Sequence, residues 1–262
     1  MEDNPLPVGI DLNCDAGESF GPWPMGDDEA LIPLMTSVNI ACGAHAGDPL
    51  VMRRTLLLAK RHNVSVGAHP GYPDLHGFGR RAIPMPPDEV EAWTLAQLGA
   101  LDAMARGVGM VLRHVKPHGA LYNMAADDEA LSEAIVRAVR AFSPELVLVA
   151  RAGSRMVLVA RAGGLRVAEE AFGDRGYDAE GRLLPRAYPG ALLHDPAAAA
   201  TRAVTLLQTG ALTTADGAVL HLHPQTLCFH SDTAGTAAIA VAVRAALLDA
   251  GMTVRPLYEL AR

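Results

Sequence analysis

The chain has 262 residues, of which 50% are hydrophobic, with 25 glycines and 18 prolines. This length suffices for one large core, and barrels built from alternating strands and helices commonly reach it as one domain, so we predict a single domain over residues 1–262. The formal net charge of −7 argues against nucleic acid or an anionic membrane as a partner.

The cysteines and the start of the chain bear on its compartment. The three cysteines lie far apart without a CxxC pair, which argues against a disulfide framework and against a structural zinc site. The opening MEDNPLPVG is acidic and lacks the basic and apolar regions of a signal peptide, and no apolar run is long enough to cross a bilayer. We therefore expect a soluble, cytoplasmic protein.

Short apolar runs alternate with longer helical stretches along the chain. The runs that end in polar residues predict buried strands at 8–15, 37–45, 64–71, 112–119, 145–153, 165–173 and 226–232. Helices are predicted at 49–62, 86–107, 127–141, 154–163, 195–209 and 234–250. Repeated strand–helix units predict a parallel sheet, and about seven of them predict an α/β fold with a closed or nearly closed barrel. The irregular stretch 173–195 is predicted as a long loop over the site.

Polar residues collect at the ends of the predicted strands. Alternate residues of a strand point to one face, and in a parallel barrel the catalytic groups come from the carboxyl ends of several strands. A single buried histidine there is more often structural, and Asp15-Ala-Gly-Glu18 also reads as a turn. The convergence of five segments nevertheless favours a functional site at this rim. Strand by strand, the residues are Asp11, Asn13 and Asp15; Asn39, Cys42 and His45; His69; His114, Lys116 and His118; and Cys228, His230 and Asp232.

Lysine is rare here: of 22 basic residues only Lys60 and Lys116 are lysines. A buried lysine shifts its pKa readily, whereas arginine stays charged, so Lys116 suits acid–base work or carboxylate binding. An equally weighted reading makes it a buried counter-ion for Asp11 or Asp232.

Three loop arginines, Arg80, Arg81 and Arg175, suit a substrate carboxylate through paired hydrogen bonds. An ordinary surface role stays open for them, particularly for Arg81.

A metal site stays open at this stage. His45, His69, His118 and Asp11 carry donor atoms for a divalent cation, but no HExxH motif is present, and HVKPH at 114–118 lies on a strand. HLH at 221–223 lies outside the strand-end series.

The sequence also lacks GxxxxGK[ST] and a strand-to-helix GxGxxG, so it does not read as a self-sufficient ATPase.

Seven motifs in order resemble the signature blocks of the LamB/YcsF family, and the likeness runs from about residue 8 to residue 255. They are DLNCDAGE (11–18), NIACGAHAGDP (39–49), VGAHPGYPD (66–74), GFGRR (77–81), HVKPHGALYN (114–123), EAFGDRGYDAEGRLLPR (170–186) and CFHSDTAG (228–235).

The resemblance implies a fold and an activity. It implies an irregular β/α barrel similar to the polysaccharide-deacetylase and glycoside-hydrolase type. It also implies the role of the A subunit in a 5-oxoprolinase, which works with subunits B and C and with ATP as co-substrate. That activity opens the lactam of 5-oxo-L-proline to give L-glutamate. The alternatives are a stand-alone metal-dependent deacetylase or amidohydrolase and a non-catalytic protein that only binds a ligand.

These expectations assign roles to the strand-end residues. Asp11 or Asp232 is the expected general base, with His45, His69 or His118 as its proton partner. Lys116 or Arg80 is expected to hold the substrate carboxylate or the developing oxyanion. Asn13 completes the catalytic candidates, and the substrate-binding candidates are Asn39, Arg80, Arg175 and His230.

Overall fold

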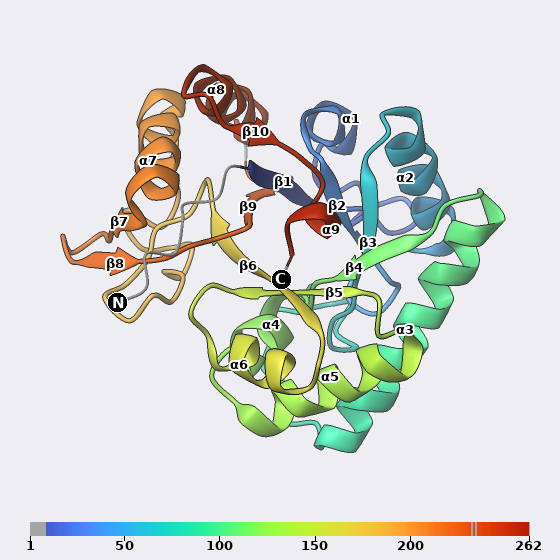
Figure 1. Cartoon of the computed structure of the whole chain (residues 1–262). Coiled ribbons are helices and arrows are strands. Elements are labelled where there is room, and N and C mark those ends of the chain that lie inside the picture. The colour runs from blue at the N-terminus through green and yellow to red at the C-terminus, as the bar shows by residue number, and fades with distance from the viewer. Residues whose placement is uncertain (1–8, 232, 234, 262) are drawn as a thin grey trace.

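Seven parallel strands form a closed ring in the computed structural model of the chain, which describes residues 9–231, 233 and 235–261 (Figure 1). They pair in the order β1-β2-β3-β4-β5-β6-β9, and β1 closes the ring because it also pairs with β9. The predicted barrel of about seven parallel strands is confirmed. The strands are β1 (Gly9–Ala16), β2 (Ser37–Ala41), β3 (Ser65–His69), β4 (Leu112–Val115), β5 (Val147–Arg151), β6 (Arg166–Phe172) and β9 (Thr226–His230).

The register of the strands sets the depth of each inward residue. On β1, Asp11 pairs with Thr226, whereas Asp15 pairs with Asn39 on one side and with His230 on the other. Parallel strands end at the same side of the ring. Asp15 therefore lies near the carboxyl ends of the strands, and Asp11 lies near their amino ends.

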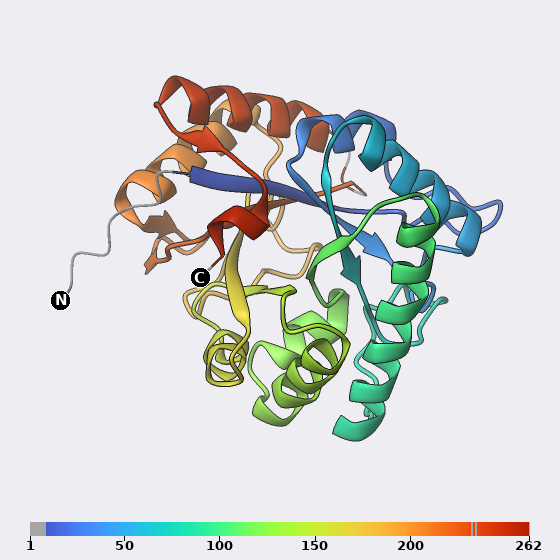
Figure 2. The same cartoon turned by 45° about the vertical axis from the view of Figure 1, so that its right-hand side comes forward.

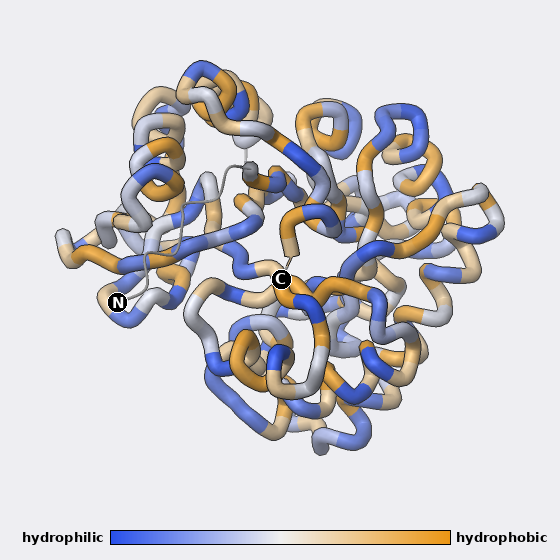
Figure 3. The backbone as a smooth tube through the Cα atoms, viewed as in Figure 1, coloured by the Kyte–Doolittle hydropathy of each residue, from blue (hydrophilic) through white to orange (hydrophobic). Residues whose placement is uncertain are grey.

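Helices cover the outside of the ring (Figures 1 and 2). Hydrophobic and hydrophilic residues alternate along them, as expected for helices with one face on a core (Figure 3). Asp48 caps α2 by accepting hydrogen bonds from the backbone N–H groups of Leu50 and Val51. The main helices are α2 (Pro49–Arg61), α3 (Pro87–Gly107), α5 (Glu129–Phe142), α6 (Arg155–Ala162), α7 (Pro196–Thr209) and α8 (Thr236–Asp249).

The amino end of the ring is covered by the last part of the chain. After β10 (Thr253–Val254) pairs with the start of β1, α9 (Leu257–Leu260) lies across the ring (Figure 1). The buried Leu257 packs with Val147, Val149 and Ala168. Its backbone N–H donates to Ser37 Oγ, 3.2 Å away. The site must therefore open at the opposite end.

Some elements differ from the prediction. The expected strand 112–119 divides into β4 and the short helix α4 (Gly119–Ala125), although the backbone N–H of His118 still donates to the Pro70 carbonyl oxygen at 2.8 Å. The hairpin of β7 (Ala211–Thr213) and β8 (Val219–His221), and the short α1 (Asp28–Leu31) with the 3₁₀ turn Ile32–Leu34, were not predicted. No helix among the described residues has the length and apolar character needed to cross a membrane.

Candidate active site

A cavity of about 490 Å³ opens at the carboxyl ends of the strands. Part of its wall is the predicted loop 173–195, which contributes Leu183, Leu184, Pro185 and Arg186. Of the predicted site residues, those that line the cavity are His69, Arg80, Lys116, His118, Arg175 and His230. Asp15, Tyr122 and Phe172 also line it.

Lys116 lies at the floor of this cavity and is almost completely buried. Its Nζ is 2.9 Å from Asp15 Oδ1, 3.0 Å from Glu170 Oε1 and 3.0 Å from Cys228 Sγ. Burial alone lowers the pKa of Lys116, but the negative charge of Asp15 and its other neighbours raises that pKa well above the ordinary value. Lys116 is therefore a permanent ammonium, and its carboxylate partners are Asp15 and Glu170.

Asp15 is the carboxylate nearest the cavity. Its Oδ1 also accepts from Asn39 Nδ2 at 2.8 Å, and its Oδ2 is 3.4 Å from His69 Nε2. Burial by itself raises the pKa of Asp15, but the charges of His69 and Lys116 hold that pKa well below its usual range. Asp15 is consequently ionised at neutral pH.

A layer of buried amides supports these carboxylates from below. Asn39 Nδ2 donates to Asn13 Oδ1 at 2.7 Å, and Asn13 Nδ2 donates to Glu170 Oε1 at 3.0 Å. The His114 ring is 2.8 Å from Asn39 Oδ1, and only a glycine at position 67 leaves room for that ring. Asn13 and Asn39 do not line the cavity, so the structure places them as positioning residues.

Asp11 lies one layer deeper and does not reach the cavity. Its carboxylate accepts hydrogen bonds from Ser37 at 2.6 Å, Thr36 at 2.7 Å and Thr226 at 2.5 Å. Burial raises the pKa of Asp11 to about 6, although these hydroxyl groups oppose the shift. The general-base role expected of Asp11 is therefore better suited to Asp15, which shares its inward face.

The raised pKa of Asp11 leads to a prediction on stability. The carboxyl has a pKa of about 6 in the folded chain against an ordinary 3.8, so ionisation costs the folded state about 3 kcal/mol. This penalty is absent below pH 3.8, grows as the pH rises to about 6 and is complete above it. Asp11→Asn, which cannot ionise, should gain stability relative to the natural chain over this interval. Denaturant unfolding of both proteins from pH 4 to 7.5 measures it, and a pH-independent difference would contradict the assignment.

Three predicted histidines gather beside Asp15. His69 Nδ1 is 2.7 Å from the carbonyl oxygen of Lys116, and its Nε2 is 3.0 Å from His118 Nδ1. The rings of His45 and His118 are stacked with centroids 3.7 Å apart. His45 thus lies behind the cavity wall. Burial lowers the pKa of His118 to about 3 and that of His45 well below its ordinary value, so both rings are neutral at pH 7.

The GFGRR turn holds this group in place. Phe78 has a φ of 53°, which is strained for a residue with a side chain, and its carbonyl oxygen is 2.8 Å from His118 Nε2. The Arg80 guanidinium then lies 4.9 Å from the centre of the Phe78 ring. Arg81 instead pairs with the buried Asp74, so of the two adjacent arginines only Arg80 lines the cavity.

The long loop adds two further cations. Arg175 donates to the carbonyl oxygens of Ala191 and Leu184, which fixes the fold of the loop. Arg186 Nη1 donates to Thr233 Oγ1 at 2.9 Å. Together with Arg80, both line the cavity, so its wall includes three arginines.

His230 is oriented by an acid that the prediction missed. Asp174 accepts from the His230 backbone N–H at 3.0 Å and lies 3.1 Å from Nδ1 of its ring. Burial raises the pKa of Asp174, but the charge of His230 and its hydrogen bonds lower that pKa overall. The ring stacks on Phe172 at 5.6 Å, which leaves its other edge toward the cavity.

Other site residues were also absent from the prediction. Glu170, Glu18, Tyr122 and Arg186 all lie in quoted motifs, and Tyr122 Oη donates to Glu170 Oε2 at 2.8 Å. Side chains along β6 alternate between the two faces of the sheet, so Glu170 points inward whereas Glu169 and Ala171 point outward. This alternation could have identified Glu170 as a site residue from the sequence. The predicted Asp232 lies outside the described residues.

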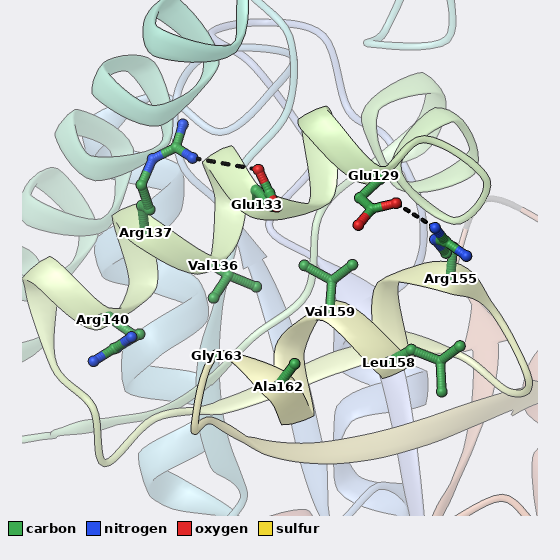
Figure 4. A pocket seen from close by; sticks show the side chains of 10 residues that line it. All are labelled: Glu129, Glu133, Val136, Arg137, Arg140, Arg155, Leu158, Val159, Ala162 and Gly163. Atoms are coloured by element: carbon green, nitrogen blue, oxygen red, sulfur yellow. Dashed lines mark hydrogen bonds and ion pairs between the residues drawn. The ribbon is translucent and has the colours of Figure 1, made fainter.

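A second hollow lies between α5 and α6 (Figure 4). Unlike the cavity at the strand ends, it does not bring together polar side chains from several strands. Its charged residues pair with each other on the surface, as Arg155 does with Glu129 and Arg137 with Glu133. Val136, Leu158 and Val159 form its apolar part. We therefore place the chemistry at the strand ends.

Known proteins resemble this chain over nearly its full length. The LamB/YcsF family model matches residues 10–262. A Chloroflexus aggregans protein, named as the A subunit of 5-oxoprolinase, is 54% identical over 248 residues, which is 95% of this chain and 98% of the relative. A Syntrophobacter fumaroxidans protein of the same name is 51% identical and covers 93% of this chain and 96% of its own length. The crystal structure of the lactam utilization protein from Thermus thermophilus is 46% identical, with a TM-score of 0.88, over 94% of this chain and 99% of that one.

Proposed function

This chain belongs to the LamB/YcsF family, and from that premise and the site we propose that it is the A subunit of a 5-oxoprolinase. The reaction is the ATP-dependent hydrolytic opening of 5-oxo-L-proline to L-glutamate, carried out together with subunits B and C. The names of the relatives from Chloroflexus and Syntrophobacter support this assignment. The observation that carries it is the ionised Asp15, paired with buried Lys116 at the floor of an arginine-lined cavity.

The cavity matches the charge of the substrate. 5-Oxoproline is a small anion with one carboxylate and one lactam, and a carboxylate is bound well by a single arginine in a bidentate manner. Arg80, Arg175 and Arg186 all line the cavity and supply positive charge around it. Such an environment also suits a phosphoryl group on the lactam oxygen, and we propose a phosphorylated intermediate. Because the sequence carries no phosphate-binding signature, we assign the ATP chemistry to the partner subunits.

Ring opening then uses Asp15 and Lys116. Once the lactam oxygen carries a phosphoryl group, water adds to the ring carbon and Asp15 takes the proton that the water loses. The Lys116 ammonium stabilises negative charge at that carbon's oxygen substituents. The carbon–nitrogen bond breaks as the nitrogen receives the proton from Asp15, and the added hydroxyl loses its own proton to become the carbonyl of an acyl phosphate. That second proton converts the released amine to an ammonium. A second water converts it to the carboxylate and phosphate.

The arginine wall leads to a prediction on substrate binding. Arg186→Ala should raise KM for 5-oxoproline by about 10- to 100-fold with a smaller change in kcat, because a hydrogen bond to a charged group is lost. Arg182→Ala is the matched control, since Arg182 belongs to the same loop, is exposed and pairs with Asp127. Steady-state kinetics of the assembled complex measures both. Equal KM values for the two variants would remove Arg186 from the binding site.

The assignment as a whole is tested by glutamate release from 5-oxoproline and ATP. We expect glutamate and ADP to form together only when this chain is mixed with its candidate B and C subunits. No glutamate from any mixture of folded subunits would refute the proposed function. Glutamate formed by this chain alone would point instead to a stand-alone amidohydrolase.

A further inference from the structure

Four buried donor groups meet beside Asp15, each from a different strand end or loop. They are the Glu18 carboxylate after β1, His45 after β2, His69 at the end of β3 and His118 after β4. One donor atom from each lies within 4.8 Å of all the others. Glu18 Oε1 is 3.4 Å from His118 Nδ1 and 3.6 Å from His45 Nε2. We call these four residues the histidine cluster.

The hydrogen bonds of His69 and His118 require a positive species between them. A carbonyl oxygen only accepts, so the ring nitrogens that face the Lys116 and Phe78 carbonyls must both carry hydrogen. In neutral rings the remaining nitrogens, His69 Nε2 and His118 Nδ1, are then both lone pairs, yet they face each other at 3.0 Å. Only a proton or a cation between them resolves this contact.

His45 supplies an independent observation. Its ring is fully buried, and neither ring nitrogen has a hydrogen-bond partner among the described residues. A buried polar atom without a partner is costly, and a nitrogen in this state is commonly explained by an ion or a water. Nε2 faces Glu18 within the cluster. A shared proton between His69 and His118 leaves this nitrogen unsatisfied, whereas a cation among all four groups satisfies it.

We propose that Glu18, His45, His69 and His118 bind one divalent transition-metal ion. Three imidazole nitrogens and one carboxylate oxygen suit zinc and related ions, whereas Mg²⁺ prefers oxygen donors alone. The carbonyl oxygens of Lys116 and Phe78 orient the His69 and His118 rings as the outer partners of metal-binding histidines usually do. In a second group of close donors, Asp15, Cys228 and His230, the first two already contact the Lys116 ammonium. Binding is independent of the proposed function, and only the use of the ion in ring opening rests on it.

The test is metal binding by the full-length chain without substrate. Protein stripped with a chelator is titrated with ZnCl₂ and, separately, with MgCl₂, and bound metal is measured by elemental analysis and calorimetry. We expect one Zn²⁺ per chain, a higher Tm with zinc and no comparable binding of Mg²⁺. His45→Ala and Glu18→Gln should each weaken zinc binding by about 100-fold or more, beyond the effect of losing an outer partner.

The control is the double variant His221→Ala, His223→Ala, which removes the HLH pair outside the cavity. It should bind zinc as the natural chain does. Circular dichroism of the metal-free variants shows whether they are folded. Folded natural chain that binds no stoichiometric zinc overturns the proposal, as does binding that survives His45→Ala and is lost with the HLH pair. Neither result depends on glutamate release, so this proposal and the proposed function fail separately.

Discussion

Asp15→Asn is expected to lower the rate of ring opening by about 10²- to 10⁴-fold, which is the usual contribution of a positioned general base. The amide has nearly the shape of the carboxylate, and its oxygen still accepts from Asn39 Nδ2 and Lys116 Nζ. What it loses is the ability to take a proton from water. The measurement is kcat/KM for glutamate formation by the complete complex.

Asp11→Asn is the matched control for this prediction. It makes the same substitution on the same strand, but its side chain is held by Ser37, Thr36 and Thr226 and does not line the cavity. We expect a far smaller kinetic effect than with Asp15→Asn, together with the pH-dependent gain in stability described above. A larger loss of activity from Asp11→Asn would return the role of base to Asp11.

Lys116→Met is expected to have the largest effect on stability, a loss of about 3–5 kcal/mol, as found when one partner of a buried ion pair is removed. The methionine leaves Asp15 and Glu170 buried without their counter-charge. Denaturant unfolding at pH 7 measures the loss. Adding Glu170→Gln should recover part of it, because one buried charge is then neutralised.

The other lysine provides the comparison. Lys60 is exposed at the end of α2, and its Nζ donates to the carbonyl oxygen of Val108. Lys60→Met should change the free energy of unfolding by well under about 1 kcal/mol beyond the loss of that one hydrogen bond. If both lysine variants proved equally stable, the Lys116 ammonium could not be the counter-ion of the site.

The sequence was sufficient to predict the ring of strands and the end of the ring that carries the site. Each strand was a short apolar run, and alternation placed Asp11, Asn13 and Asp15 on one inward face. Alternation reports the face but not the depth, because depth depends on the register between strands. The pairing of Asp11 with Thr226, far away in the chain, places Asp11 in the lower layer. That pairing has no local signal, so the sequence alone could not separate the depth of Asp11 from that of Asp15.

The missed acids have a similar cause. Glu170 matters because ring closure brings it to within 3.0 Å of Lys116, and Glu18 matters because three histidines from other loops surround it. Alternation places Glu170 on the inward face, but neither contact can be predicted from the neighbouring residues. Both positions lie within the motifs that carry the family resemblance. A motif, however, gives a stretch of sequence and does not say which side chains contact one another. Packing likewise decides which loop arginines line the cavity, because Arg81 pairs with Asp74 instead.

The closure of the ring through β1 and β9 also has a consequence for synthesis of the protein. β1 leaves the ribosome long before its partner β9, which comes after nearly all other strands. Until β9 is made, β1 and β6 each present an open strand edge, and such edges readily pair with other chains. The nascent chain therefore has a long interval in which it needs protection from aggregation, and the contacts of Lys116 are completed only when Cys228 arrives.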